Sequence, residues 1–289
     1  MALLAGLALP ALGKQADPVV QVDWCKRLSP RLPGISTAAC QGSALAPTGA
    51  LSRQGFPILF RKIPAKNSKS NKPPVRIMLL GGIHGDELTA AAIVFKWMQW
   101  IPTASAQDFY WEVVPVVNPD GLLAPKPKRV NANGVDLNRN FPTPGWQKDA
   151  PLYWAKATGS DPRRFPGTAP LSEPETRWLN EEMERFKPQV IISVHAPFGV
   201  LDFDGPAPAP QRFGRLVFNR VGVYPGSLGN YGGTHKNVPV ITIELPNALA
   251  MPPEAEVQRI WLDMLTWIKQ NVPAPDPMMA QQRPRMIAR

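Results

Sequence analysis

Short apolar runs alternate with segments of helical character along the chain from Gly55 onward. Five of these runs are rich in β-branched residues: FPILF, VRIMLL, WEVVPVV, QVIISVH and VPVITIEL. Runs of this length and composition are typical of buried β-strands. Between and after them we expect helices over 86–101, 173–186, 210–221 and 254–270, and an earlier helix over 18–28.

Strands that alternate with helices predict an α/β fold with a mixed, largely parallel central sheet and helices on both faces. In such folds the chemistry takes place at the carboxyl ends of the strands. Ser172 and Glu175 form the S-x-x-E pattern of a capping box, which is expected to open the helix over 173–186. The loops 119–171 and 222–239 hold most of the Gly, Asn and Pro and are expected to be exposed to solvent.

The length and composition allow a globular domain with additional terminal segments. The chain has 289 residues, of which 44% are apolar, enough for a hydrophobic core. We expect a leader and extension over 1–54, a catalytic domain over 55–271 and a disordered basic tail over 272–289. The 35 prolines are about 12% of the chain against a usual level of about 5%, which indicates rigid, loop-rich connections. No uninterrupted apolar run reaches about 18 residues, so no transmembrane helix is expected.

The net charge of +10 is unevenly distributed. Residues 1–76 contain eleven Lys or Arg and two Asp, which gives them +9, whereas 77–271 carry −1. A nucleic-acid enzyme usually places its basic residues around its site, so no nucleic-acid partner is expected. The basic segment is interpreted as a solvated extension, with a weak attraction to anionic membrane or cell-wall polymer as the alternative.

The two cysteines, Cys25 and Cys40, are too few for a structural zinc site, which needs about four ligands. A disulfide between them would close a short loop in an oxidising compartment. The first thirteen residues, MALLAGLALPALG, resemble the apolar core of a signal peptide, although a positive segment before it is missing. Together these features favour export to the periplasm, with a cytoplasmic location as the alternative.

Two of the three histidines stand at the ends of predicted strands. His84 follows the run RIMLLGG, with Glu87 three residues later where a helix begins, and His195 ends QVIISVH. Two histidines and a carboxylate make a ligand set that suits a catalytic zinc with one open position. The alternative is that these are satisfied polar groups at strand ends. His235, in the loop sequence GGTHKN, is expected to be exposed.

Two acidic residues lie within predicted strands. Glu244, near the end of PVITIEL, is expensive to bury unless it is paired or used. It is interpreted either as one half of a buried salt bridge or as a general base beside a metal. Glu112 stands at the start of its strand and is expected to face solvent.

The segment RVNANGVDLNRNFP, residues 129–142, concentrates polar side chains between two strands. It contains two arginines, four asparagines and an aspartate. Arginine is suited to bidentate recognition of a carboxylate and to stabilising an oxyanion. By itself the segment could be a tight loop held by Asx turns, but beside the strand-end histidines it is interpreted as a substrate-binding loop.

These motifs, taken in order, resemble those of the zinc metallocarboxypeptidase family. The resemblance rests on H-x-x-E at 84–87, NPDG at 118–121, GVDLNRNFP at 134–142, His195 and TIELP at 242–246. The motifs GGIHGDE, NANGVDLNRNFP and SEPET are most similar to those of the bacterial murein peptide amidases of that family. The resemblance covers roughly residues 55–271.

The resemblance implies a role for each matching residue. His84, Glu87 and His195 would bind one zinc ion per chain, and Asp136 would orient His84. Glu244 would take a proton from the attacking water and deliver it to the departing amine. Arg129 would polarise the scissile carbonyl, and Asn138 and Arg139 would hold the free carboxylate of the leaving amino acid. The mobile tyrosine of the family matches Tyr224, with Tyr231 as the rival.

The implied function is hydrolysis of the γ-D-glutamyl–meso-diaminopimelate bond of murein peptides. The stretch 226–229, where the family places its side-chain pocket, offers no charge that would explain recognition of diaminopimelate. An ordinary metallocarboxypeptidase and an N-acyl amino acid deacylase are the alternative enzymes. A non-catalytic cell-wall binding protein is a third hypothesis, motivated by the basic N-terminal segment.

Overall fold

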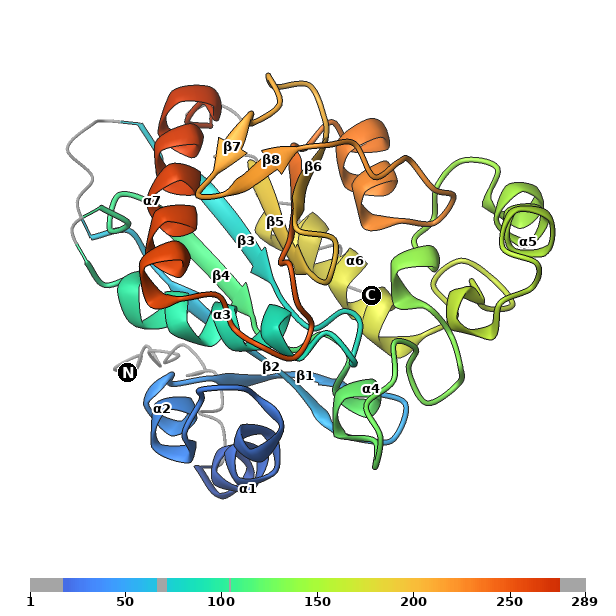
Figure 1. Ribbon diagram of the computed structural model, residues 1–289, viewed down its shortest axis with the longest axis horizontal. Helices are drawn as coiled ribbons and strands as arrows, with labels where there is room; N and C mark the ends of the chain where they lie inside the picture. Colours follow the sequence, from blue (N-terminus) through green and yellow to red (C-terminus); the bar gives the residue numbers. More distant parts are fainter. Residues whose placement is uncertain (1–17, 67–71, 104, 276–289) are drawn as a thin grey trace, which may run out of the picture.

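The computed structural model describes residues 18–66, 72–103 and 105–275 (Figure 1). Its centre is a nine-stranded sheet with the strand order β1-β2-β4-β3-β5-β9-β6-β8-β7. The strands are β1 (Ala46–Leu51), β2 (Pro57–Ile63), β3 (Arg76–Leu80), β4 (Tyr110–Val114), β5 (Val190–His195), β6 (Val200–Asp204), β7 (Arg212–Phe213), β8 (Leu216–Phe218) and β9 (Val240–Glu244).

Seven α-helices and four shorter helical segments accompany the sheet in the described residues. The α-helices are α1 (Pro18–Leu28), α2 (Thr37–Gly42), α3 (Leu88–Trp100), α4 (Pro119–Leu123), α5 (Trp146–Ala157), α6 (Pro174–Phe186) and α7 (Glu254–Asn271). The shorter segments are the 3₁₀ turns η1 (Ser29–Arg31), η2 (Leu137–Arg139) and η3 (Pro162–Arg164), and the π-helix η4 (Gly229–His235). None of the helices in this part of the chain is long and apolar enough to cross a membrane.

The central strands are parallel, and this positions the functional residues. β4, β3, β5 and β9 run in one direction, while β2 and β6 pair antiparallel at either side of them. The carboxyl ends of parallel strands meet at one edge of a sheet, where loops and helix starts gather. In the β5–β9 pair, His195 lies directly opposite Glu244.

Helices cover both faces of the sheet, as predicted (Figure 1). Alternate residues of β3 point into different clusters: Ile77 and Leu79 pack with α3 and α7, whereas Met78 and Leu80 pack with α6. This alternation follows from the two-residue period of a strand. On the α3–α7 side, Trp261 stacks on Trp111 with ring centroids 5.4 Å apart.

The five predicted strands and the helices expected over 18–28, 86–101, 173–186 and 254–270 are confirmed with small shifts at their ends. The helix expected over 210–221 is wrong, because this segment forms the short hairpin β7–β8. Gly214 makes the turn at φ +54°, a conformation that favours glycine. The hairpin buries Phe213 and Leu216 in the α3–α7 core.

The capping box expected from Ser172 and Glu175 does not form. Glu173 is the N-cap of α6, and no side chain caps the helix there. The Ser172 hydroxyl instead donates to Glu173 Oε1 at 2.8 Å, and the Asn131 amide donates to Glu173 and Glu175. These side chains are therefore committed to holding the 131–140 loop against the start of α6.

Glu112 was expected to face solvent and is fully buried. Glu112 is the middle residue of β4 and lies beside Met78 in the sheet, on the face that α6 covers. The Glu112 carboxylate lies 3.1 Å from Lys62 Nζ, which also contacts Glu182 of α6 at 2.8 Å. Burial and the neighbouring Glu182 raise the pKa of Glu112 to about 8, against the opposing effect of Lys62.

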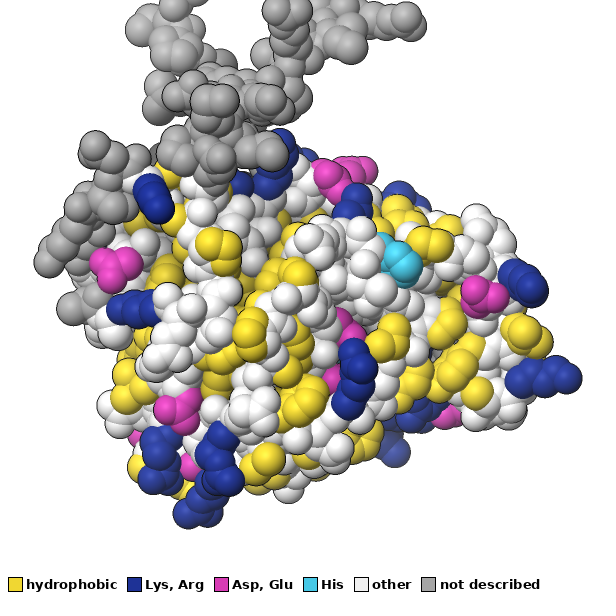
Figure 2. Space-filling model, turned by 90° about the horizontal axis from the view of Figure 1, so that it is seen from above, with side chains coloured by type: hydrophobic (Ala, Val, Ile, Leu, Met, Phe, Trp, Pro, Cys, Tyr) yellow, Lys and Arg dark blue, Asp and Glu magenta, His cyan; other side chains and the backbone are white. Residues whose placement is uncertain are grey.

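The segment before Gly55 contributes to the sheet. The boundary expected after residue 54 falls between β1 and β2, which pair antiparallel with Ala46 opposite Phe60. The disulfide Cys25–Cys40 joins α1 to α2, and both cysteines are buried in the main core. The predicted leader and most of the predicted tail lie outside the described residues. On the face seen in Figure 2, basic side chains are dispersed rather than gathered in one patch.

Candidate active site

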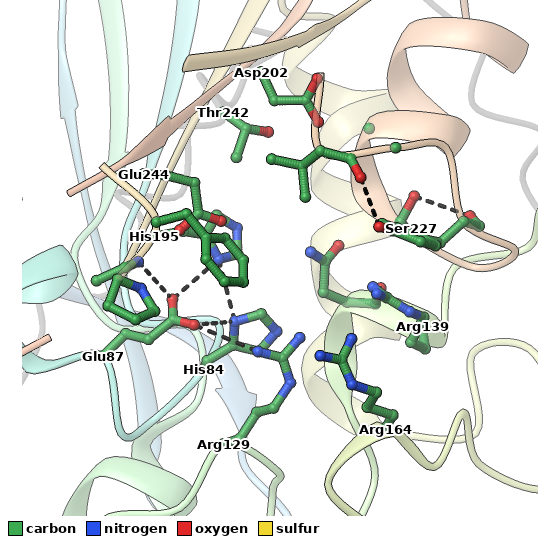
Figure 3. A pocket seen from close by; sticks show the side chains of 18 of the residues that line it. His84, Glu87, Arg129, Arg139, Arg164, His195, Asp202, Ser227, Thr242 and Glu244 are labelled. Carbon is green, nitrogen blue, oxygen red and sulfur yellow. Dashed lines mark hydrogen bonds and ion pairs between the residues drawn. The ribbon is translucent and has the colours of Figure 1, made fainter. Parts of the chain in front are cut away.

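A cavity of about 330 Å³ opens at the carboxyl ends of β3, β5 and β9 (Figure 3). His195 and Glu244 are the last residues of β5 and β9, and Glu87 is the N-cap of α3. His84 lies in the tight turn that joins β3 to α3. Gly85 is required in that turn, because a Cβ there would lie 2.2 Å from the Gly121 carbonyl carbon of the NPDG segment.

Three predicted ligands converge on one point. His84 Nδ1 and His195 Nδ1 face each other at 3.1 Å, and the Glu87 carboxylate lies 2.8 Å from the first and 3.1 Å from the second. All three side chains are buried. Among the residues that the structure describes, they form the one cluster of His, Cys, Asp or Glu with the spacing of a metal site.

The far nitrogen of each imidazole has its own partner. His84 Nε2 lies 3.1 Å from Asp136 Oδ1, and His195 Nε2 lies 3.0 Å from Ser193 Oγ. A carboxylate that accepts from Nε2 keeps the proton there, so the Nδ1 lone pair of His84 points to Glu87 and His195. Two ring nitrogens facing each other beside a carboxylate are a donor set that a cation fits. Zinc accepts N and O ligands of this kind.

Asp136 connects the histidine to an arginine. Besides His84, its carboxylate accepts from Arg129 Nε at 2.9 Å and from the Asn138 backbone N–H at 3.0 Å. Burial alone would raise the pKa of Asp136, but Arg129 and His84 hold it well below its usual range. The carboxylate therefore stays ionised and fixes both neighbours.

Glu244 lines the same cavity with one oxygen free. The residue is 6% exposed, and its Oε2 atom is buried without a hydrogen-bond partner in the described part of the chain. Burial raises the pKa of Glu244, with Glu87 adding to the effect and His195 opposing it. An unpartnered, proton-accepting carboxylate beside a ligand set is what a general base requires.

Arginines form the opposite wall of the cavity (Figure 3). Arg129 Nη1 lies 3.4 Å from Glu87 Oε1, so its guanidinium reaches the ligand cluster. Arg139 is buried; it donates to the Asn138 carbonyl at 2.6 Å, and its Nε has no partner in the described residues. Burial and the nearby Arg129 and Arg164 lower the pKa of Arg139, opposed by Asp136. Arg129 is already paired with Asp136 and Glu87, whereas the buried Arg139 has no ion pair in the described residues and is therefore available to bind a carboxylate.

The two candidate tyrosines occupy different environments. Tyr224 lines the cavity, with the Arg139 guanidinium 4.4 Å above its ring, and its hydroxyl donates to the Val221 carbonyl at 2.7 Å. Tyr231 is buried against Phe141, with ring centroids 5.8 Å apart. The structure thus brings Tyr224, and not Tyr231, to the site. His235 is exposed and lies apart from the ligand cluster.

Several charged residues of the cavity were not predicted from the sequence, among them Arg163 and Arg164 of η3 and Asp202 and Asp204 of β6. The strand VLDFD carries its two aspartates two residues apart, and that alternation could have identified them as one polar face. The arginines follow Pro162 in an irregular loop, where no periodic pattern marks them.

Comparison with known proteins identifies relatives of this chain. The family model described as zinc carboxypeptidase matches residues 47–201. Murein peptide amidase A of Escherichia coli (strain K12) is 32% identical over 199 residues, which cover 66% of this chain and 77% of that protein. The murein peptide amidase A of Vibrio campbellii is 30% identical over 199 residues, 66% of this chain and 75% of that protein.

Solved structures resemble the fold. The murein-tripeptide amidase from Escherichia coli O157 superposes with a TM-score of 0.50 at 26% identity, covering 75% of this chain and 90% of that one. Carboxypeptidase A from Helicoverpa armigera superposes with a TM-score of 0.57 at 18% identity, covering 83% and 69% of the two chains. This second likeness concerns the fold alone.

Proposed function

The chain belongs to the zinc carboxypeptidase family, and we propose that it hydrolyses the amide bond between γ-D-glutamate and meso-diaminopimelate in murein peptides. Membership of this family makes it a hydrolase. The observation that carries the specific proposal is the convergence of the His84–Glu87–His195 cluster, Glu244 and the arginine wall on one cavity. The similarity to murein peptide amidase A supports the choice of bond.

One zinc ion would be held by His84, Glu87 and His195. These residues fit the ion because their donor atoms already converge and their far atoms are fixed by Asp136 and Ser193. When bound, zinc polarises a carbonyl and makes a water molecule acidic near neutral pH. Asp136 keeps His84 in the tautomer that leaves Nδ1 available for the ion.

The remaining residues divide the reaction between them. Glu244 accepts the proton of the attacking water at its free Oε2 and later donates it to the departing amine. Arg129 stabilises the negative charge that develops on the scissile carbonyl oxygen. Asn138 and Arg139 bind the free carboxylate of the leaving residue, so cleavage occurs next to a chain end. The Tyr224 ring packs against the Arg139 guanidinium and forms part of the cavity wall.

Identification of the products tests this proposal. The zinc-loaded protein is incubated with L-Ala-γ-D-Glu-meso-diaminopimelate, with and without a chelator, and the products are analysed by mass spectrometry. We expect free diaminopimelate and L-Ala-D-Glu, with release abolished by the chelator. An intact tripeptide alongside cleavage of ordinary C-terminal residues would identify a general carboxypeptidase, and cleavage of N-acyl amino acids would identify a deacylase.

We also propose that the protein acts in an oxidising compartment, the periplasm. The pairing of Cys25 with Cys40 supports this location, because such bonds persist where thiols are not kept reduced. Alkylation of intact cells before lysis, followed by mass spectrometry, tests it. Unmodified, disulfide-linked Cys25 and Cys40 are expected, and two alkylated thiols would place the protein in a reducing compartment.

A further inference from the structure

Two carboxylates in the cavity have no part in the proposed reaction. Asp202 and Asp204 lie two residues apart on β6, so both side chains leave the same face of the strand. Each is only 5% exposed, and both line the cavity. Figure 3 shows Asp202 on the side of the cavity opposite Arg129 and Arg164. The cavity is therefore basic on one side and acidic on the other.

The two carboxylates are held differently. Asp202 accepts a hydrogen bond from the Phe203 backbone N–H at 2.8 Å, and burial raises its pKa, opposed by the backbone N–H groups of Val221 and Gly222 in the loop that carries Arg220. Within the described residues, no group donates a hydrogen bond to Asp204. Its ion-pair partner, Arg220, is 4.0 Å away with a side chain that is 63% exposed. Since an exposed pair at this distance contributes little, Asp204 is a buried carboxylate without adequate compensation.

The π-helix η4 leaves room for the Asp204 carboxylate. A Cβ on Gly229 would lie 2.2 Å from Asp204 Oδ2, and a Cβ on Gly233 would lie 2.5 Å from the Asp204 Cβ. Gly229 itself lines the cavity. The backbone of η4 thus packs against an acidic group that is poorly paired within the protein. A group of this kind at the end of a binding cavity is suited to a cationic ligand.

We propose that Asp204 and Arg220 recognise the amino-acid head group at the end of the diaminopimelate side chain, Asp204 binding its ammonium and Arg220 its carboxylate. This inference rests on the proposed function, in which Asn138 and Arg139 hold the other carboxylate of the leaving residue. Its side chain then extends from the arginine wall toward β6. Asp202 lines the same side of the cavity and adds to its negative charge.

Four free amino acids of matched chain length allow the contact with Asp204 and the contact with Arg220 to be measured separately. Diaminopimelate offers both charges on its terminal carbon, L-lysine offers only the ammonium, L-2-aminopimelate only the carboxylate, and L-norleucine neither. A buried, charge-assisted hydrogen bond corresponds to roughly 10-fold or more in affinity. An exposed charge pair corresponds to roughly two- to fivefold. Diaminopimelate should therefore bind the zinc-loaded protein about 10-fold more tightly than L-2-aminopimelate and a few-fold more tightly than L-lysine.

Isothermal titration calorimetry of variants assigns each contact. Asp204→Asn should remove the preference over L-2-aminopimelate, and Arg220→Gln the preference over L-lysine. Gly229→Ala should also remove the preference over L-2-aminopimelate, because the new Cβ would displace the Asp204 carboxylate without removing it. Glu184→Gln and Arg215→Gln are matched controls at side chains that are 60% and 81% exposed, and they should leave all four affinities unchanged.

The outcomes separate this inference from the proposed function. Equal binding of L-norleucine and diaminopimelate, or full preference retained in both Asp204→Asn and Gly229→Ala, would overturn the head-group assignment. If diaminopimelate is preferred as expected but L-Ala-γ-D-Glu-meso-diaminopimelate is not cleaved, the head-group assignment holds and the proposed bond is wrong. If the tripeptide is cleaved without any preference among the four amino acids, only the head-group assignment fails.

Discussion

Replacing Asp204 by asparagine removes a buried charge and almost no volume, so its effect on stability isolates the cost of that charge. Burial and the neighbouring Asp202 raise the pKa of Asp204 from 3.8 to about 6, with Arg220 opposing them. The folded protein therefore favours the protonated acid more than the unfolded chain does. The wild-type protein loses stability from this group as the pH rises from about 3.8 to about 6, and the loss stays constant above that range.

The size of the effect follows from the two pKa values. A shift of about two pKa units corresponds to at most about 3 kcal/mol of lost stability at neutral pH, because the carboxylate lines an open cavity and is partly screened by solvent. At pH 5 about half of that loss is already present, because the unfolded carboxyl is ionised and the folded one is not. The free energy of unfolding of Asp204→Asn, relative to wild type, should therefore rise by about 1 kcal/mol between pH 5 and pH 8.

Urea denaturation followed by tryptophan fluorescence measures this difference. Both proteins are prepared with the same zinc content and unfolded at pH 5 and pH 8. The constant cost of burying an asparagine amide cancels, since only the change with pH is compared. Glu184→Gln, at an exposed position, should show no such change. A difference between variant and wild type that is constant with pH, or that falls as the pH rises, would refute the reasoning.

Three further predictions concern other parts of the molecule. The double variant Cys25→Ala, Cys40→Ala should lose about 3 kcal/mol of unfolding free energy in urea, because the bond closes a loop with a sequence separation of 15; a loss below about 1 kcal/mol would contradict this. Asp136→Asn should weaken zinc binding by about 10- to 100-fold in competition with a fluorescent chelator, since its carboxylate fixes His84, and unchanged affinity would argue against that role. Gly85→Ala should destabilise the protein by more than about 2 kcal/mol in thermal unfolding, because its Cβ would collide with the Gly121 backbone, and a stable variant would show that the turn can relax.

The sequence was sufficient to predict the central strands because these strands are buried on both sides. The runs that form β3, β5 and β9 are almost wholly apolar, so the few polar residues in them were easy to identify as candidates for function. His195 and Glu244 end two such runs, and their positions alone indicated a shared site. The structure adds the distances that bring them to His84 and Glu87.

Features that depend on tertiary neighbours were not predictable from local patterns. Glu112 was expected outside because it begins a strand, yet β2 and α6 cover it, and Lys62 provides its counter-charge. The hairpin β7–β8 was interpreted as a helix because its strands are two and three residues long, too short for alternation to be visible. The acidic side of the cavity was missed for a related reason, since β6 follows a turn with no long apolar run to mark it.

The central claim is that a zinc-loaded His84–Glu87–His195 site works with Glu244 as the proton acceptor. The most direct test measures zinc content and the rate of tripeptide cleavage in the same samples of wild type and Glu244→Gln. The account predicts one zinc ion per chain in both proteins and a loss of kcat by at least about 100-fold in the variant. Full activity of Glu244→Gln at equal zinc content, or an active wild-type protein that holds no zinc, would contradict it.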